Sequence, residues 1–375
     1  MHHPSALAIA VVIAALTLAA GSADAQSTFR LSPIFSTAQV FDTNVLSSSS
    51  DRLTDAVTRV SPGVESTYQS PRVTIRGRHT FDVERFASHA EFSTLLARQH
   101  GTVDITYRPA GRLLVVADAE MSTTETPGEL AVETGLTFAR AYARRLTAHG
   151  SIARRITQTT SALVDYRVTA DRIAGGPDGR TQTAAIRADR RLSARSTVRA
   201  GMRSQHMSFG DTSTTSHALI AGWMHALTPR LTVSLDGGPR LTNGSVDPDM
   251  SALLRYERGA VVATTSYANT RMPIIGVPGV AKTESVTMSI GWPLGRATQV
   301  RIAPGYFRSA LDGSHASVYR LTVDATRRLS AGVSVGVTAD AVSQHGNIYS
   351  PLSRAIIPRR TLTVTFTAAS TRSSR

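Results

Sequence analysis

Polar and apolar residues alternate with a period of two through most of this 375-residue chain. Successive side chains of a β-strand point to opposite faces of the sheet, so this period is typical of strands, and helical periodicity is scarce. In residues 333–341, valines and alanines take the odd positions, whereas serine, glycine, threonine and aspartate take the even ones. The clearest other stretches are residues 73–84, 103–108, 164–169 and 361–366. The pattern predicts an all-β chain.

The charged residues of these stretches fall on one parity, and the other parity is apolar or small. A soluble sandwich buries its apolar face, whereas a membrane barrel turns that face to lipid and its polar face to water. Alternation alone fits both, and a soluble periplasmic β-protein therefore stays as an alternative.

A turn-like motif repeats along the chain and favours the barrel. Its copies are Arg154-Arg155-Ile156-Thr157, Arg190-Arg191-Leu192-Ser193, His225-Ala226-Leu227-Thr228, Trp292-Pro293-Leu294-Gly295 and Arg327-Arg328-Leu329-Ser330. Further tight turns are expected at residues 70–71, 109–111 and 256–259, and longer polar loops at 47–50, 123–129, 175–179, 210–216, 242–249 and 343–350. Short turns on one rim and longer loops on the other are the asymmetry of an outer-membrane barrel. Eight tight turns predict a transmembrane antiparallel up-and-down β-barrel of about eighteen strands, with sixteen as the alternative.

The first residues predict export. An apolar run from Ala6 to Ala20 precedes Ala23-Asp24-Ala25, a small-x-small pattern typical of a signal peptidase site. We therefore expect a signal peptide over residues 1–25 and a single barrel over 26–375 that ends in a short polar tail. The absence of cysteine excludes disulfides and thiolate metal sites. The expected location is a bacterial outer membrane, with lipid, lipopolysaccharide and the barrel-assembly machinery as partners.

The chain carries a formal net charge of +14, and Lys282 is its only lysine. Such a balance can indicate a nucleic-acid protein. The export signal and the scatter of the arginines along the chain argue against nucleic acid as a partner.

The start of the expected barrel resembles a known family. Phe41-Asp42-Thr43-Asn44-Val45, Ser50-Asp51 and Val60-Ser61-Pro62-Gly63-Val64 are similar to motifs of the β-barrel porin 2 family. The repeated Leu-Ser/Thr-x-Arg turns extend the resemblance loosely along the chain. It implies an outer-membrane barrel associated with exopolysaccharide production or export. For Asp42, Asn44 and Asp51, the simplest expectation is that their side chains satisfy backbone groups of a turn.

Common catalytic and cofactor motifs are not found, and no enzyme activity, cofactor or metal is expected. The sequence has no Gly-x-Ser-x-Gly elbow, no His-Glu-x-x-His pair and no phosphate-binding glycine loop. A serine, a histidine and an acid could still meet across strands, which leaves an outer-membrane hydrolase as an alternative. Asp247-Pro248-Asp249 is expected to lie in a loop, as a polar turn or, as the second reading, a cation site.

The charged parity supplies the candidate functional residues, which should face the lumen. They are Arg76, Arg78, Asp104, Arg108, Asp165, Arg167, Arg187, Asp189, Arg199, Arg203, Arg301, Arg320, Asp324 and Asp340. One interpretation is a porin-like channel whose arginines concentrate small anionic solutes or an anionic polysaccharide. The other is that these residues form cross-strand ion pairs that brace the wall of a non-conducting scaffold barrel of an export system.

Overall fold

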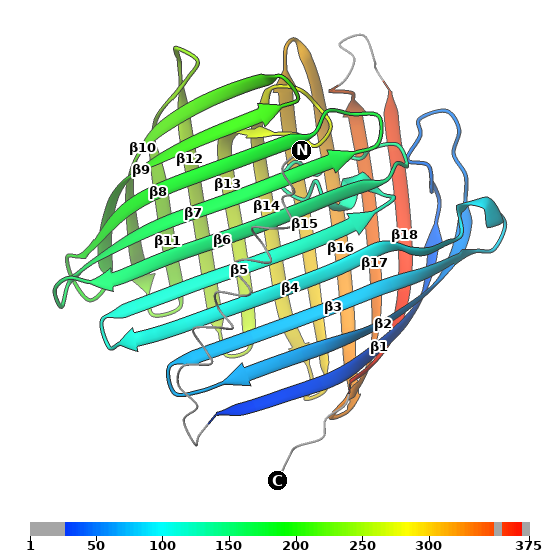
Figure 1. Ribbon diagram of the computed structural model, residues 1–375, viewed down its shortest axis with the longest axis horizontal. Helices are drawn as coiled ribbons and strands as arrows, with labels where there is room; N and C mark the ends of the chain where they lie inside the picture. The colour runs from blue at the N-terminus through cyan, green and yellow to red at the C-terminus, as the bar shows by residue number, and fades with distance from the viewer. Residues whose placement is uncertain (1–26, 349–354, 370–375) are drawn as a thin grey trace.

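The computed structural model describes residues 27–348 and 355–369, and about three quarters of them lie in eighteen antiparallel strands (Figure 1). The expected signal peptide and residues 370–375 of the expected polar tail lie outside the described residues. The strands are β1 (Thr28–Asp42), β2 (Asp55–Gln69), β3 (Val73–Phe86), β4 (Thr94–Ala110), β5 (Leu113–Thr124), β6 (Ala143–Arg155), β7 (Thr160–Ile173), β8 (Gly179–Arg191), β9 (Ser196–Phe209), β10 (Thr212–Thr228), β11 (Leu231–Thr242), β12 (Ser245–Arg258), β13 (Val261–Pro273), β14 (Val280–Leu294), β15 (Thr298–Leu311), β16 (Ser314–Ser330), β17 (Val333–Gly346) and β18 (Ile356–Ala369). Two short 3-10 helices, η1 (Ala90–Phe92) and η2 (Pro127–Glu129), lie in connections.

The sheet closes on itself. Each strand pairs with its neighbours in the sequence, and β1 pairs with both β2 and β18. At the seam, Ile34 lies opposite Ala369 and Asp42 lies opposite Thr361. Closure leaves no unpaired edge, which is the condition for strands to cross a bilayer. The predicted closed antiparallel barrel and the preferred count of eighteen strands are confirmed.

The connections of the two rims differ as the repeat predicted. We call the rim at which β1 begins and β18 ends the turn rim. Its eight connections lie at residues 70–72, 111–112, 156–159, 192–195, 229–230, 259–260, 295–297 and 331–332. The opposite rim, the loop rim, has connections at 43–54, 87–93, 125–142, 174–178, 210–211, 243–244, 274–279, 312–313 and 347–355. All eight expected tight turns therefore adjoin a turn of the same rim.

Two of the expected loops are wrong. Most of residues 210–216 and 242–249 belong to strands, which are joined by two-residue hairpins at Gly210-Asp211 and Asn243-Gly244. Asn243 and Gly244 have φ angles of 47° and 83°, the left-handed pair that a tight hairpin turn requires. At the other end of the chain, β18 continues to Ala369, so the first residues of the expected tail are strand.

The outer face of the wall is apolar and exposed. Phe29, Leu31, Phe35 and Phe41 of β1 point outward and are 44–70% exposed. The same holds around the ring, for example at Ile152, Val164, Ile186, Met202, Leu219, Leu235, Val286, Leu321, Val337, Leu362 and Val364. Apolar side chains that would be buried in a soluble sandwich are thus turned outward, and the outer surface is that of a barrel in a lipid bilayer. In the described residues, no helix is long and apolar enough to span a membrane.

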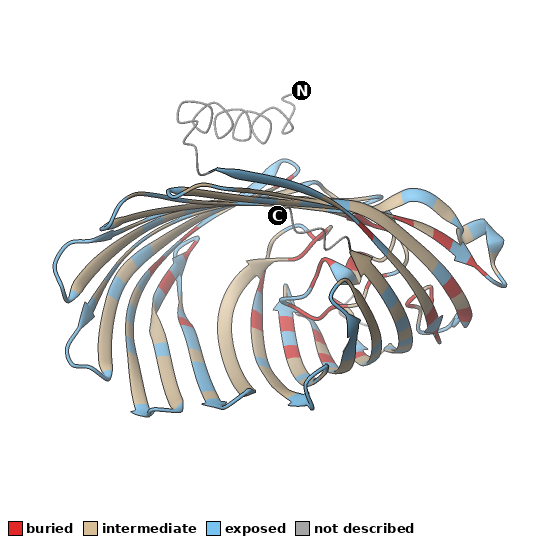
Figure 2. Cartoon of the chain, turned by 90° about the horizontal axis from the view of Figure 1, so that it is seen from below, coloured by how far each residue is buried: buried red, intermediate tan, exposed pale blue. Residues whose placement is uncertain are grey.

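The buried residues lie inside the ring, mostly toward the loop rim (Figure 2). Residues 125–142, between β5 and β6, turn into the barrel, and we call them the inward segment. Its side chains pack with residues 274–277 and with the inner wall in one apolar cluster of Leu130, Ala131, Leu136, Phe138, Ala143, Ile274, Ile275, Val277, Ala281, Phe307, Ala316, Val318 and Ile348. The barrel therefore has a partial core, on one side and near one rim.

Candidate functional site

The inward segment is held at its base by polar contacts to the strands around it. Glu129 forms an ion pair of 2.5 Å with Arg98 of β4 and accepts a hydrogen bond of 3.0 Å from the Thr124 hydroxyl. Arg145 of β6 donates to the backbone carbonyl of Leu130. Near the end of the segment, Arg140 pairs with Glu125. The segment is therefore a fixed part of the interior rather than a loop that projects into solvent.

The segment also reaches the far wall. The backbone N–H of Thr137 donates a hydrogen bond of 2.7 Å to Oε1 of Gln344 on β17. Gly135 lies against the ring of Phe307 on β15, where an added Cβ would come within 2.6 Å of Cδ2. In an eighteen-strand ring β15 is the strand directly opposite β6, so the segment crosses the interior. Gly135 also has a φ of 63°, and only glycine meets both demands without strain.

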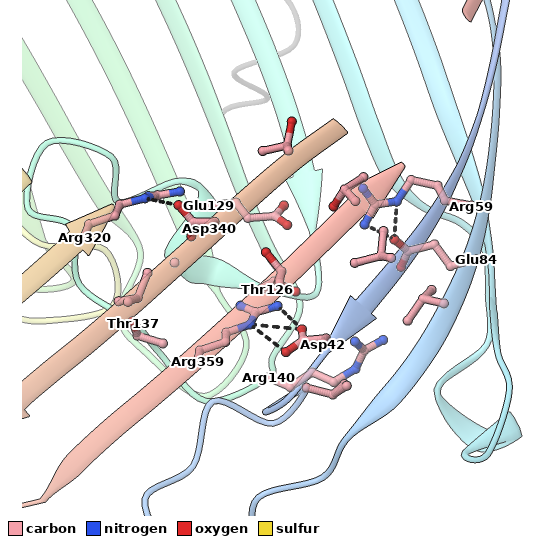
Figure 3. Close-up of a pocket in the computed structure, with 18 of the residues that line it drawn as sticks. Asp42, Arg59, Glu84, Thr126, Glu129, Thr137, Arg140, Arg320, Asp340 and Arg359 are labelled. Atoms are coloured by element: carbon pink, nitrogen blue, oxygen red, sulfur yellow. Dashed lines mark hydrogen bonds and ion pairs between the residues drawn. The ribbon is translucent and has the colours of Figure 1, made fainter. Parts of the chain in front are cut away.

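A cavity of about 250 Å³ lies between the inward segment and the wall formed by β16 to β18 and β1 to β3. Its lining is charged on both sides. Three arginine–carboxylate pairs lie around it: Arg59 with Glu84 at 2.7 Å, Arg359 with Asp42 at 2.6 Å, and Arg320 with Asp340 at 2.9 Å (Figure 3). Glu129 and Arg140 of the segment face the same cavity. A solute here would meet guanidinium and carboxylate groups close together.

The cross-strand register shows where the predicted residues lie. Phe307 and Gln344 contact the inward segment, so the face that carries them is the inner face of the wall. Thirteen of the fourteen predicted residues lie on this face. The exception is Arg108, which lies at the turn rim, past a register shift between β4 and β5. Only Arg320 and Asp340 of the set line the cavity. A role in contacting a solute stays a prediction for all fourteen.

Most of these residues have a partner of opposite charge. The pairs are Arg78–Glu65 at 3.4 Å, Arg187–Asp189 at 3.3 Å, Arg199–Asp236 at 3.1 Å, Arg203–Asp249 at 3.4 Å, Arg301–Asp324 at 2.7 Å and Arg320–Asp340 at 2.9 Å. Arg78 and Arg301 keep 51% and 58% of their side-chain surface exposed. Water therefore reaches the inner wall away from the segment, and the wall carries both signs of charge rather than arginine alone.

A row of charges crosses five strands. Directly opposed in register are Arg76, Asp104, Asp118, His149 and Arg167, on β3 to β7. Nδ1 of His149 lies 2.6 Å from a carboxylate oxygen of Asp118, and Nε2 contacts Asp165 of β7. The imidazole on β6 thus links the carboxylates of β5 and β7, the strands on either side of it.

Arg199 reaches across a whole strand. It lies 3.5 Å from Asp189 on β8 and 3.1 Å from Asp236 on β11, although β10 lies between β9 and β11. Gly222 occupies the crossing point on β10, and a Cβ there would come within 2.0 Å of Asp236 and 2.5 Å of Arg199. The missing side chain therefore makes the bridge possible.

The sequence predicted that Asp247 and Asp249 lie in a loop. This is wrong, because both lie in β12. Asp249 contacts Arg240, which is 1% exposed and also bonds Gln205 and Ser216, while Asp247 pairs with Arg271. Both carboxylates therefore have arginine partners, which is not a cation site. Across residues 27–348 and 355–369, no three His, Asp or Glu side chains are grouped to hold a metal ion.

The acids of the opening motif close a turn. Oδ1 of Asp42 accepts a hydrogen bond of 2.9 Å from the Asn44 N–H, and the Asn44 side chain bonds the backbone of Ser48 and Pro358. The Ser48 hydroxyl accepts from the N–H of Asp51 at 3.1 Å. The expected turn-closing role is thus observed for the side chains of Asp42 and Asn44, and Asp42 adds the ion pair with Arg359. The Asp51 carboxylate instead accepts a hydrogen bond of 3.0 Å from the Ser50 hydroxyl.

Ser122, His100 and Glu120 form a Ser/His/acid cluster on the inner face. Nδ1 of His100 lies 2.9 Å from the Ser122 hydroxyl and 3.8 Å from Glu120, and the hydroxyl donates to Glu120 at 3.3 Å. In a hydrolase the two ring nitrogens bridge the serine and the acid. Here one nitrogen faces both, so the cluster has a different geometry from a catalytic triad.

Sequence reasoning missed the inward segment and the paired residues of the cavity, namely Asp42 as an ion-pair partner, Arg59, Glu84, Glu129, Arg140 and Arg359. One signal was available for the segment. Leu130, Leu136 and Phe138 lie beyond the loop expected at 123–129 and do not form an alternating strand pattern, and apolar side chains in a connection indicate that it packs inward.

The positive charge of the chain is concentrated at the turn rim. Fourteen exposed arginines lie in the turns and at the strand ends beside them, and we call them the arginine collar: Arg72, Arg108, Arg112, Arg154, Arg155, Arg190, Arg191, Arg195, Arg230, Arg255, Arg258, Arg296, Arg327 and Arg328. Asp189 and Glu257 are the acidic residues in these stretches. Among residues strictly between strands, the described loop-rim connections carry Asp51, Glu91, Glu125, Glu129, Glu133, Asp178, Asp211 and Asp312 against Arg52 and Arg140. By the same measure, the turn-rim connections carry Arg72, Arg112, Arg195, Arg230 and Arg296 and no acidic residue. The connections of the two rims therefore carry opposite charge.

No protein-family model matches the sequence, and no curated protein matches it. The resemblance of the opening residues to the β-barrel porin 2 family thus stays a prediction. Among solved structures, OpdO of Pseudomonas aeruginosa superposes with a TM-score of 0.50 at 11% identity, over 90% of this chain and 97% of that one. The outer membrane protein OpdK of the same species gives 0.48 at 9% identity over 91% and 99%, and OccAB4 of Acinetobacter baumannii gives 0.47 at 8% over 92% and 99%. Together with the apolar outer surface, the likeness to OpdO shows that the chain has the fold of a porin-like outer-membrane β-barrel.

Proposed function

We propose that the protein is a passive channel for small hydrophilic solutes, with a preference for anions that arises at the mouth formed by the turn rim. The observation that carries the proposal is a charged, water-exposed inner wall inside a closed ring of eighteen strands, narrowed on one side by the inward segment. A barrel of this strand number is wide enough for an aqueous lumen.

The source of the anion preference differs from the one expected from the sequence. Wall arginines have carboxylate partners, so their fields largely cancel at a distance. The collar has only Asp189 and Glu257 to balance it. The inward parity of Arg155, Arg191 and Arg328 directs these three side chains to the mouth. An unbalanced ring of charge at an opening raises the local concentration of the opposite ion. By the usual orientation of such barrels, this mouth faces the periplasm.

Two alternatives are weaker. The motif that resembles polysaccharide-associated barrels is engaged in closing a turn, so it offers no support for a sugar site. A scaffold barrel without transport would need the inward segment to seal the interior, whereas the exposed side chains of Arg78 and Arg301 leave water along the wall.

The test is single-channel recording of the purified protein in a planar bilayer under a salt gradient. We expect stable conductance and a reversal potential of the sign that anion flow produces. R155Q/R191Q/R328Q should move the reversal potential toward zero, and R154Q/R190Q/R327Q, which removes the same charge from the outer face, should change it less. A folded barrel that passes no current contradicts the channel, and cation preference contradicts the role of the collar.

A further inference from the structure

One arginine of each Arg-Arg pair at the turn rim faces away from the mouth. In register, Arg190 lies opposite Val198 and Arg327 lies opposite Val335, both on the outer face, whereas Arg191 and Arg328 lie opposite inward-facing Thr197 and Ser334. Arg154 and Arg155 divide in the same way. Each pair thus places one guanidinium at the mouth and one on the outside of the barrel, where the apolar wall meets lipid.

The outward arginines sit beside exposed aliphatic side chains. The residue that follows each pair, Ile156, Leu192 or Leu329, is 55–59% exposed. Ile156 and Leu192 lie in the turn itself, and Leu329 lies at the end of β16. Leu227 and Leu294 take the same position in the other two copies of the motif, at 48% and 64% exposed. An exposed aliphatic group next to a guanidinium is typical of a membrane interface. There the aliphatic side chain enters the acyl region of the lipid, and the charged group stays at headgroup level.

Aromatic residues mark the same level. Trp223, Tyr256 and Trp292 lie on the outer face close to the turn rim, and such residues concentrate where lipid meets water. Arg190 and Trp223 occupy one row of the sheet, two strands apart through Val198. Two strand spacings amount to about 10 Å, so Arg190 and Trp223 are near neighbours on the outer face.

We propose that the outward arginines of the collar, with Arg190 and Arg327 as the best-placed pair, bind the phosphates of anionic phospholipids in the periplasmic leaflet. The planar guanidinium donates paired hydrogen bonds to a phosphate, and little acidic side chain at this rim competes for it. The binding surface is the outer edge of the turn rim, distinct from the mouth that the proposed channel uses.

The chain carries its own reporter of this surface, because it has two tryptophans and both lie on the outer face near the turn rim. The purified protein is reconstituted into phosphatidylcholine vesicles that contain either brominated phosphatidylglycerol or, at equal mole fraction, brominated phosphatidylcholine. Bromine quenches tryptophan emission only at close range. We expect stronger quenching by phosphatidylglycerol, equivalent to a local enrichment of roughly fivefold for each arginine that binds, and a loss of this excess at high salt.

The matched variants are R190Q/R327Q and R191Q/R328Q, which remove equal charge from neighbouring positions. The first should abolish the excess quenching, and the second should leave it. Equal quenching by the two lipids in the unmodified protein overturns the proposal and points to a partner other than lipid. An equal loss of the excess quenching in both variants also overturns the proposal, since the lipid would then be attracted by the overall charge of the rim rather than by the outward arginines. Neither result depends on conductance, so the channel is tested separately.

Discussion

The backbone N–H of Thr137 and Oε1 of Gln344 are joined by a hydrogen bond of 2.7 Å that ties the inward segment to the opposite wall of the barrel. Gln344 is 3% exposed, and its own side-chain NH2 donates to the carbonyl of Gly346 at 3.3 Å. The carbonyl and the NH2 of this one amide thus connect the segment to the end of β17. The bond holds the segment across the lumen in the proposed channel.

Gln344→Ala should release the far end of the segment. A hydrogen bond of this kind contributes about 1 kcal/mol, enough to change a two-state balance roughly fivefold. We expect single channels of the variant to show a higher mean conductance or more frequent switching between levels. Gln299→Ala is the control, since Gln299 is an exposed, inward-facing glutamine of β15 far from the segment. Identical traces for Gln344→Ala and the unmodified protein would show that the bond does not position the segment.

Gly135→Ala should displace the segment from Phe307. The new Cβ would clash with the ring at 2.6 Å, and the φ of 63° adds the cost of left-handed backbone, about 1–2 kcal/mol. Gly175→Ala is a matched control because Gly175 has a φ of 81° but open space around it. We expect Gly135→Ala to lower the midpoint of thermal unfolding more than Gly175→Ala does. Equal shifts would mean that backbone strain alone accounts for the loss.

Low pH should loosen the segment at Glu129. Burial disfavours the charged carboxylate, but the nearby Arg98 guanidinium outweighs this, and the pKa of Glu129 lies below its usual value of 4.5. Because the pKa is lowered in the folded protein, the stabilisation is present above the unfolded pKa and is lost as the pH falls through the folded one. We expect the conductance to hold through pH 4.5 and to change only in more acidic solution.

Glu129→Gln tests the assignment of this acid transition. It should show the altered conductance already at neutral pH, and the acid-induced step should be much smaller. An unchanged step in the variant would assign the transition to another group.

The fold was more predictable than the site, for reasons visible in particular residues. Strand pairing is local here, so the period-two pattern and the repeated Arg-Arg-Leu-Ser turns were enough to predict the ring and its eight short connections. The same pattern was misread at residues 210–216 and 242–249 because both stretches are rich in glycine, serine, threonine, asparagine and aspartate, which are also typical of loops. Asn243-Gly244 was the available hairpin signal.

The site depends on contacts that no local pattern contains. Thr137 and Gln344 are 207 residues apart, and Asp42 and Arg359 are 317 apart. Parity predicts which side of the wall an arginine occupies, but not which carboxylate it meets. The register between strands was therefore needed to choose between an arginine-biased lumen and the cross-strand ion pairs of the second interpretation, and to separate the paired wall from the largely unpaired collar.

Gly222→Ala should split the ion pair that bridges β10. The added methyl would come within 2.0 Å of Asp236 and 2.5 Å of Arg199, so one of the two side chains has to leave. The overpacking and the partly unpaired charge should together destabilise the barrel by about 1–3 kcal/mol. Gly291→Ala is the control, since Gly291 also faces inward and its nearest contact to an added Cβ is 3.9 Å away. Urea titration of folding into lipid vesicles measures both, and the Asp236→Asn background separates the two causes. If the ion pair stabilises the barrel, Gly222→Ala should lower the free energy of unfolding by less in the Asp236→Asn background than in the unmodified protein. An equal loss in both backgrounds would mean that steric crowding accounts for the whole effect.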